Sequence, residues 1–441
     1  MFSNKDLRNL IFPLCIEQFL LMLVGIADTF IVSFSSEANV SGVSLVNSFN
    51  TVMVFLFTAL SSGGAVIISQ YIGSRNHRTA EKAAGQLLMV SVAISAIVSS
   101  FILIFDRRLL SLLFGKVDSD VMEASEVYLK ITTYSLPALA VYDAGAALSR
   151  STGKAKTTMY VSTVANVINI IGNCIGVFVL HLGVAGVAYP SLISRILSAT
   201  AITVLCFKKG NRPRYHIKDI VTWNGNLLKK IMSIALPNGI ENGVHQFVKV
   251  ALSSMVALFG TYQIAANGLA QSIWSLASII GLAMAPAYTT VIGQCMGARD
   301  IDSGNYYFKK LNKITLMLSV LWNAFVFAIT PLIVEHSSIS TEAKALVIWL
   351  VLINTIFNGF AYPFAGPLGN GLRAAGDVKF TMLVSISLTI AVRLFFSFLF
   401  GLWLNWGAIG IAIGMSIDLV FRGAIFIWRY KSQKWTKIQL I

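Results

Sequence analysis

The sequence contains few charged residues, few cysteines and few histidines. Only 12% of its 441 residues are charged, whereas a soluble chain carries about 25%, so an ordinary water-soluble protein is excluded. The four cysteines and five histidines form no CxxC pair and no HExxH motif, and the sequence has neither a GxSxG motif nor a Walker loop. We therefore expect no enzyme, no resident metal and no cofactor.

What the sequence has instead is long apolar segments. Hydrophobic residues make up 56% of the chain, and the segments are continuous, which favours helices over the alternating strands of a membrane barrel. A spanning helix needs about 20 apolar residues. The sequence predicts an all-α membrane protein with twelve transmembrane helices in two pseudo-symmetric six-helix bundles. The predicted spans are 10–33, 42–72, 83–105, 124–148, 158–180, 183–207, 231–258, 262–295, 314–334, 343–369, 380–402 and 407–429.

The net charge of +15 follows the orientation of the spans and does not form a nucleic-acid-binding patch. If the N-terminal tail lies inside, 25 of the 34 Lys and Arg residues fall in inner segments and 5 in outer segments. This asymmetry is the positive-inside signature. We expect a monomer in the cell membrane with both termini in the cytoplasm, the lipid bilayer around it, and no nucleic-acid partner.

The chain repeats itself after about 224 residues. Pro13 and Glu17 recur as Pro237 and Glu241, and a chance likeness of apolar segments would not match proline and glutamate. Further matches, at offsets of 224 or 223, are Gln70 with Gln294, Gly73 with Gly297, Arg75 with Arg299, Arg150 with Arg373 and Gly153 with Gly376. Six spans per half make the repeat parallel, and transporters of this kind bind substrate near the membrane midplane.

The longest hydrophilic segment divides these halves. We predict an N-terminal lobe at 1–207, a basic cytoplasmic linker at 208–230 and a C-terminal lobe at 231–441.

Taken together, these segments resemble the multidrug and toxic compound extrusion family over essentially the whole chain. The resemblance rests on residues 25–29 after Pro13 and Glu17, on residues 63–73, on Asn169 to Asn173, and on residues 293–298. It implies an antiporter that exports organic solutes or drugs in exchange for Na⁺ or H⁺ by alternating access.

Asp28 is the leading candidate for the coupling-ion residue. It lies in the middle of an apolar segment, and intramembrane acids mark ion pathways; the alternative is a carboxylate held in place by Asn or Ser donors. The resemblance implies that Asn169, Asn173 and Ser191 join it. Asn173 stands where the family has a second acid, so this site would carry one negative charge with neutral oxygens, which suits Na⁺ or H⁺.

A secondary ion or substrate site is expected at Glu17 and at a stripe on the seventh span. The stripe consists of Glu241, His245 and Lys249, spaced four residues apart. It could relay protons or bind an anion, or it could be a neutral pair of Glu241 with Lys249 bridged by His245.

Other ionisable residues lie within the predicted spans. Asp418 and Arg422 are four residues apart and predict a structural salt bridge. The sequence indicates no partner for Asp143, Arg195 or Arg393.

Pro13 gives the first helix a place to bend, as the resemblance implies, unless it lies in that helix's first turn. A substrate cavity is expected to be lined by aromatic and polar residues that would bind cationic or amphipathic compounds, although ordinary packing accounts for such residues equally well. The candidates are Tyr142, Gln271, Trp274, Asn354 and Tyr362.

The alternative function is a flippase for lipid-linked precursors, from a related two-lobe family. A pyrophosphate cargo would require several cationic residues within the spans. Those available are Arg195, Lys249, Arg393 and Arg422.

Overall fold

The computed structural model describes residues 2–115, 118–208, 210, 213–337 and 339–441, and within them all regular structure is helical. The first half of the chain contains α1 (Asn4–Val32), α2 (Glu37–Gly73), α3 (His77–Phe114), α4 (Ser119–Tyr134), α5 (Leu136–Ser151), α6 (Ala155–Cys174), η1 (Ile175–Val179), α7 (Ala185–Phe207) and α8 (Ile217–Val221). Then follow α9 (Gly225–Ala257), α10 (Thr261–Ala277), α11 (Ile279–Gly297), α12 (Ile301–Glu335), α13 (Thr341–Phe360), α14 (Tyr362–Ala365), α15 (Pro367–Ala374), α16 (Val378–Ser387), η2 (Leu388–Leu394), α17 (Phe395–Ser397), η3 (Phe398–Trp403), α18 (Gly407–Lys431) and η4 (Lys434–Lys437).

Ten helices among the described residues are long and apolar enough to cross a membrane. The predicted spans 124–148 and 231–258 have no counterpart among these ten. The first is divided at Ser135 into α4 and α5, of 16 residues each. The second lies in α9, where the polar stretch at 238–246 lowers the hydropathy. The count of twelve therefore stays a prediction.

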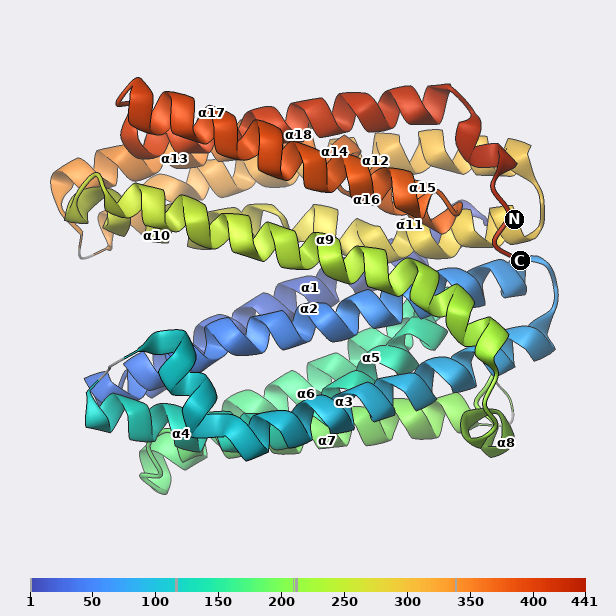
Figure 1. Cartoon of the computed structure of the whole chain (residues 1–441), viewed down its shortest axis with the longest axis horizontal. Helices are drawn as coiled ribbons and strands as arrows, with labels where there is room; N and C mark the ends of the chain where they lie inside the picture. The colour runs from blue at the N-terminus through green and yellow to red at the C-terminus, as the bar shows by residue number, and fades with distance from the viewer. Residues whose placement is uncertain (1, 116–117, 209, 211–212, 338) are drawn as a thin grey trace. The chain divides into compact units, whose positions relative to one another are not determined.

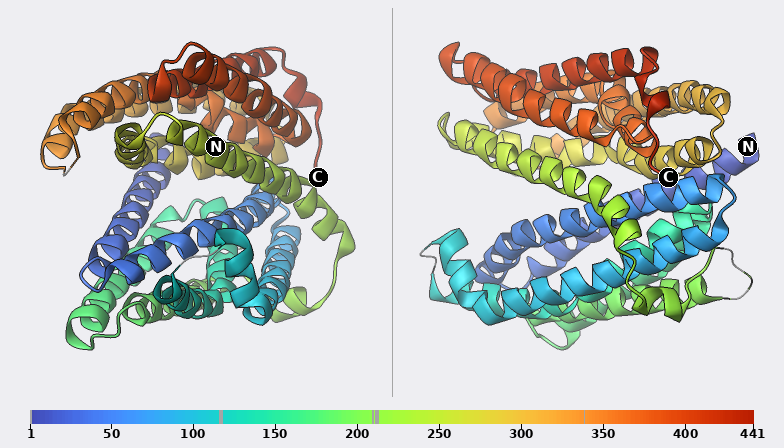
Figure 2. Two further views of the ribbon diagram at one scale, coloured as in Figure 1. Left: turned by 60° about the vertical axis from the view of Figure 1, so that its left-hand side comes forward. Right: turned by 45° about the vertical axis from the view of Figure 1, so that its right-hand side comes forward.

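The chain forms two compact units (Figures 1 and 2). The first unit is Ser3–Leu236, and the second is Pro237–Ile441 together with Phe2. The boundary thus falls inside α9, at the repeated proline. In the first unit α6 packs against both α1 and α7, while α2 packs against α3, α4 and α5. In the second unit α13 packs against α10 and α12, and α15 packs against α11.

The repeat seen in the sequence extends to the backbone conformation. Arg75 and Arg299 end their helices in the left-handed region, at φ of 60° and 57°. The next residue in each half, Asn76 or Asp300, accepts a hydrogen bond from a main-chain N–H and so caps the following helix. Other left-handed residues recur at the same spacing: Gly153 with Gly376, His181 with Asn405, and Gly183 with Gly407.

Each half also contains a π-helical segment in the region before its last long helix. The segments are η1 (Ile175–Val179) and η3 (Phe398–Trp403), again about 224 residues apart. Next to them the backbones approach very closely. A Cβ on Gly186 would lie 2.7 Å from the carbonyl carbon of Gly176, and one on Gly410 would lie 2.4 Å from that of Phe400. Glycine is required at both positions because no side chain fits there.

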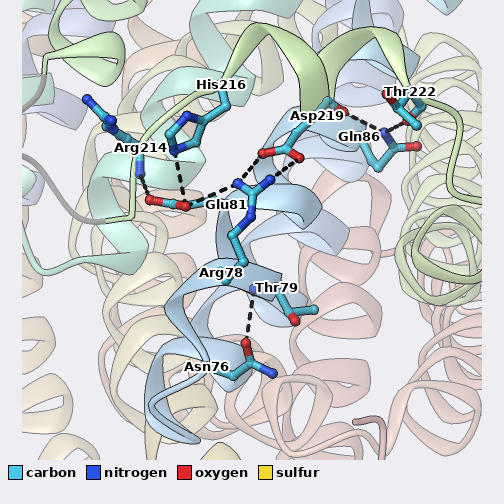
Figure 3. Close-up of polar contacts among 9 residues, drawn as sticks. All are labelled: Asn76, Arg78, Thr79, Glu81, Gln86, Arg214, His216, Asp219 and Thr222. Atoms are coloured by element: carbon cyan, nitrogen blue, oxygen red, sulfur yellow. Dashed lines mark hydrogen bonds and ion pairs between the residues drawn. The ribbon is translucent and has the colours of Figure 1, made fainter.

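The basic segment before α9 is fastened to the first unit by α3 (Figure 3). Arg78 donates to both carboxylate oxygens of Asp219, at 2.6 and 2.8 Å. Gln86 donates to the carbonyl oxygens of Asp219 and Thr222, both at 2.7 Å. Glu81 forms ion pairs with Arg78 and His216, at 3.3 and 3.2 Å. The predicted linker is therefore held by specific polar contacts along part of its length.

Replacing Asp219 with asparagine should loosen this segment. Asp219 is buried, but about half of the Arg78 side chain is exposed, so water partly screens the pair and the cost should be modest. We expect trypsin to cleave folded protein after Arg214 or Lys218 about ten-fold faster, the effect of losing roughly one charge-assisted hydrogen bond on local opening. The control is Asp106→Asn, which removes a more exposed ion pair with Lys130. Equal cleavage of both variants and the wild type would contradict the anchoring role.

Candidate functional site

The structure brings the four predicted ion-site residues together inside the first unit. Asn173 on α6 donates from Nδ2 to the carboxylate of Asp28 on α1 and also to Oδ1 of Asn169, at 3.2 Å. Asn169 in turn donates to the hydroxyl of Ser191 on α7, at 3.0 Å. The three partners of Asp28 are buried. One chain of hydrogen bonds therefore joins α1, α6 and α7.

This cluster retains a free acceptor. Oδ1 of Asn173 is buried and has no hydrogen-bond partner among the described residues. An unsatisfied buried carbonyl is costly, and it lies on the amide that also binds Asp28. A carboxylate with a neutral amide oxygen beside it is the kind of ligand set that a hard cation or a proton can use.

Two further ionisable residues lie near Asp28, and the sequence indicated no partner for either. Arg195 on α7 donates to Ser135 at 2.7 Å and interacts electrostatically with both Asp28 and Asp143. Asp143 on α5 has a buried carboxylate oxygen without a hydrogen-bond partner in the described part of the chain. With Asp28, Asp143 and Arg195, this region carries one more negative than positive group.

Glu17 and Glu241 occupy matching ion pairs, one in each unit. Glu17 accepts from Arg150 at 2.6 Å, and it also accepts from Tyr142 and Thr158 at 3.1 and 3.2 Å. Glu241 accepts two bonds from Arg373, at 2.7 and 2.6 Å. The sequence flagged all four charged residues as repeated, but it gave no signal that they pair.

The predicted stripe on α9 does not act as one unit. The alternative in which Glu241 pairs with Lys249 through His245 is wrong, because Glu241 binds Arg373 and Lys249 is exposed. His245 instead contacts Arg422 through Nε2 at 3.0 Å and Thr389 through Nδ1 at 3.5 Å. Its partners come from the segments that contain η2 and α18.

The predicted salt bridge between Asp418 and Arg422 is confirmed, at 2.8 Å. It is joined by Arg393, whose guanidinium lies 2.6 Å from the same carboxylate. Asp418 is fully buried. Two arginines thus share one acid in the second unit.

Pro13 lies well inside α1, nine residues after its first residue. The alternative that places it in the first helical turn is therefore wrong, and a proline at this depth leaves a carbonyl of the preceding turn without its usual donor. Pro237 occupies the matching place inside α9.

Five residues were predicted to line a substrate cavity. Tyr142 belongs to the first unit, where its hydroxyl binds Glu17. The ring of Tyr362 in the second unit covers Gly281, since a Cβ there would lie 2.1 Å from the ring. Gln271, Trp274 and Asn354 are partly buried in the second unit. Their role in binding substrate stays a prediction.

The structure shows a cavity of about 260 Å³ that the sequence did not indicate. It lies in the first unit along α1 and α2. Polar side chains from α2 line one part of it, namely Ser44, Asn47, Ser48 and Thr51. Asn47 also accepts a hydrogen bond from Tyr128 at 3.2 Å.

The model of one protein family, described as MatE, matches this chain twice, at residues 13–175 and 237–399. The chain belongs to this family. The two matches begin and end 224 residues apart, the same offset that relates the two proline–glutamate pairs. This MATE protein is therefore a transporter and no enzyme, and it is embedded in a membrane through several apolar helices.

Similar MATE proteins cover almost the full length of the chain. "Uncharacterized transporter YisQ" of Bacillus subtilis (strain 168) is 27% identical over 98% of this chain and 94% of its own length. "Probable multidrug resistance protein NorM" of Thermotoga maritima is 23% identical over 98% and 93%. A solved outward-facing multidrug resistance MATE transporter of the MOP superfamily has 22% identity, a TM-score of 0.90 and coverage of 98% and 97%. That likeness shows the shared fold.

Proposed function

We propose that this MATE transporter is a secondary active antiporter that exports organic solutes in exchange for Na⁺ or H⁺ by alternating access. The observation that carries the proposal is the cluster around Asp28. It combines a carboxylate on α1 with a buried, unpartnered amide oxygen on Asn173. A group that must gain a cation or a proton to be neutral at membrane depth is suited to coupling.

The ion would act by changing which arrangement of α1 is stable. Neutralising Asp28 weakens its attraction for the Asn173 amide and for Arg195, both of which lie outside α1. Pro13 interrupts the hydrogen-bond ladder of the same helix. The bound and free states of the ion would then favour different conformations, which is the differential interaction that coupling requires.

The substrate would be a small organic compound, cationic or amphipathic. Relatives carry multidrug resistance in their names, and aromatic side chains such as Tyr142, Trp274 and Tyr362 can bind cations by cation–π contact. We assign the substrate cavity to these residues together with Gln271 and Asn354.

Transport in inside-out vesicles tests this function directly. A Na⁺ gradient and a pH gradient are imposed separately, and uptake of a fluorescent cationic dye such as ethidium is followed. Uptake driven by either gradient and absent without one supports antiport. Uptake that needs no gradient, or none of any organic solute, would refute it.

We further propose twelve membrane spans with both termini in the cytoplasm of a monomeric protein. A variant lacking the four native cysteines, with one new cysteine at Lys218 before α9, should resist a membrane-impermeant maleimide added to intact cells. The matched control is a cysteine at Glu342, exposed at the start of α13 and predicted to lie outside, which should react. Labelling of Lys218→Cys from outside would overturn this topology.

A further inference from the structure

The second unit contains a buried group of charged residues that the coupling ion does not use. We call it the arginine cluster. Its members are His245 on α9, Thr389 and Arg393 on η2, and Asp418 and Arg422 on α18. The two arginine side chains are 12% and 7% exposed and the aspartate is 0% exposed, so the charges are largely removed from water.

The arginine cluster has more positive than negative charge. The ion pairs of Arg393 and Arg422 among the described residues both end on Asp418. Neither guanidinium can lose its proton in a protein. His245 directs Nε2 at Arg422, so that nitrogen must be an acceptor and the ring neutral. The other nearby acid, Glu241, is already bound twice by Arg373.

One donor of the cluster is unused. Arg422 uses Nη1 for His245 and Nη2 for Thr389 and Asp418. Its Nε is buried and has no hydrogen-bond partner in the part of the chain that the structure describes. A buried cationic donor without an acceptor, beside an excess positive charge, is the counterpart of a missing anion.

The fold does not require these charges, because the first unit folds with neutral residues at the matching places. At the 224-residue offset, Arg393 corresponds to Asn169, Asp418 to Ser194, Arg422 to Ser198, His245 to Leu21 and Thr389 to Ala165. In the other direction, Asp28 corresponds to Leu252. Each unit therefore has its own polar group, one with excess negative and one with excess positive charge.

The local backbone supports a binding role. Thr389 and Arg393 lie on η2, a π-helical segment of seven residues, and short π-helical segments are frequent at functional sites. η1 and η3 recur in both halves, whereas η2 belongs to the second unit and the matching residues 164–170 form part of α6.

From this geometry we infer that the arginine cluster is a binding site for an anionic group, the carboxylate of an organic solute. A carboxylate matches the planar fork of a guanidinium and accepts two parallel hydrogen bonds, and it would neutralise the excess charge. This inference goes beyond the proposed function, since it concerns an anion and not the coupling cation.

The test is a binding measurement on the purified full-length protein in lipid nanodiscs, with no gradient present. Sodium benzoate is the probe, and the midpoint of thermal unfolding is followed as its concentration rises at constant ionic strength. Benzamide has the same ring without the charge, and sodium chloride supplies an inorganic anion. We expect a saturable rise with benzoate and none with benzamide or chloride. An equal rise with chloride, or none with benzoate, would overturn the inference.

Variants locate the site. Arg422→Gln and Arg393→Gln each leave one arginine paired with Asp418, so the excess charge is gone. Each should weaken benzoate binding about ten-fold or more, the loss expected for a charge-assisted hydrogen bond. Lys249→Gln removes one positive charge from an exposed position of the same unit and should bind as the wild type does. If Lys249→Gln weakens binding as much as the arginine variants, benzoate responds to net charge and the site is refuted. Because no transport is measured, failure here leaves the role of Asp28 untouched.

Discussion

Replacing Asp28 with asparagine is expected to abolish gradient-driven efflux while leaving the amount of protein in the membrane unchanged. Asparagine has nearly the same size and can still bind the Asn173 amide, so the contact between α1 and α6 survives. The variant cannot gain or lose a charge, however, and coupling requires a group whose interactions differ between the ion-bound and ion-free states. The measurement is dye uptake in inside-out vesicles under imposed Na⁺ and pH gradients.

Three other ionisable residues serve as controls for this experiment. Asp143→Asn removes a second buried acid of the same unit, whose free oxygen has no hydrogen-bond partner among the described residues. Glu241→Gln and His245→Ala alter the second unit. If Asp28→Asn transports as the wild type does while one of these variants fails, the coupling residue is elsewhere and our assignment is wrong.

The sequence predicted the Asp28 group well because two simple rules apply to it. Asn169 and Asn173 are four residues apart and must share one face of a helix, and the resemblance to the family placed that face next to Asp28. The repeat was equally accessible, since Pro, Glu and Gly residues rarely match at one constant offset by chance. Its left-handed residues, such as Arg75 and Arg299, followed from the same matches.

Ion pairs between distant helices were beyond such rules. Glu241 was assigned to neighbours on its own helix because helical spacing is the information that a single sequence carries. Its real partner, Arg373, lies 132 residues away on α15, and only the packing of helices brings the two together. The same holds for Arg393, which lies 25 residues from Asp418. The repeat marked Glu17, Arg150, Glu241 and Arg373, and the structure adds that each repeated acid binds the repeated base of its own unit.

These paired bridges lead to the second large effect, which concerns stability. Glu17 is 1% exposed and is bound by Arg150 at 2.6 Å, so Arg150→Met would leave a carboxylate buried without its cation. Removing one partner of a buried pair typically costs about 3–5 kcal/mol. We expect a large fall in the midpoint of thermal unfolding of the purified protein, and Arg373→Met should do the same in the second unit through Glu241.

The double variant Glu17→Gln/Arg150→Met separates the loss of a bond from the exposure of a charge. Replacing both partners removes the uncompensated carboxylate, and glutamine can still accept from Tyr142 and Thr158. The unfolding midpoint should therefore recover most of what Arg150→Met alone loses. An exposed pair is the control: the side chains of Lys130 and Glu126 are 46% and 26% exposed, and Lys130→Gln should cost less than about 1 kcal/mol. If Arg150→Met is no less stable than Lys130→Gln, the bridge is dispensable for the fold, and Glu17 returns as a candidate for the secondary ion site that its place in the first span predicts.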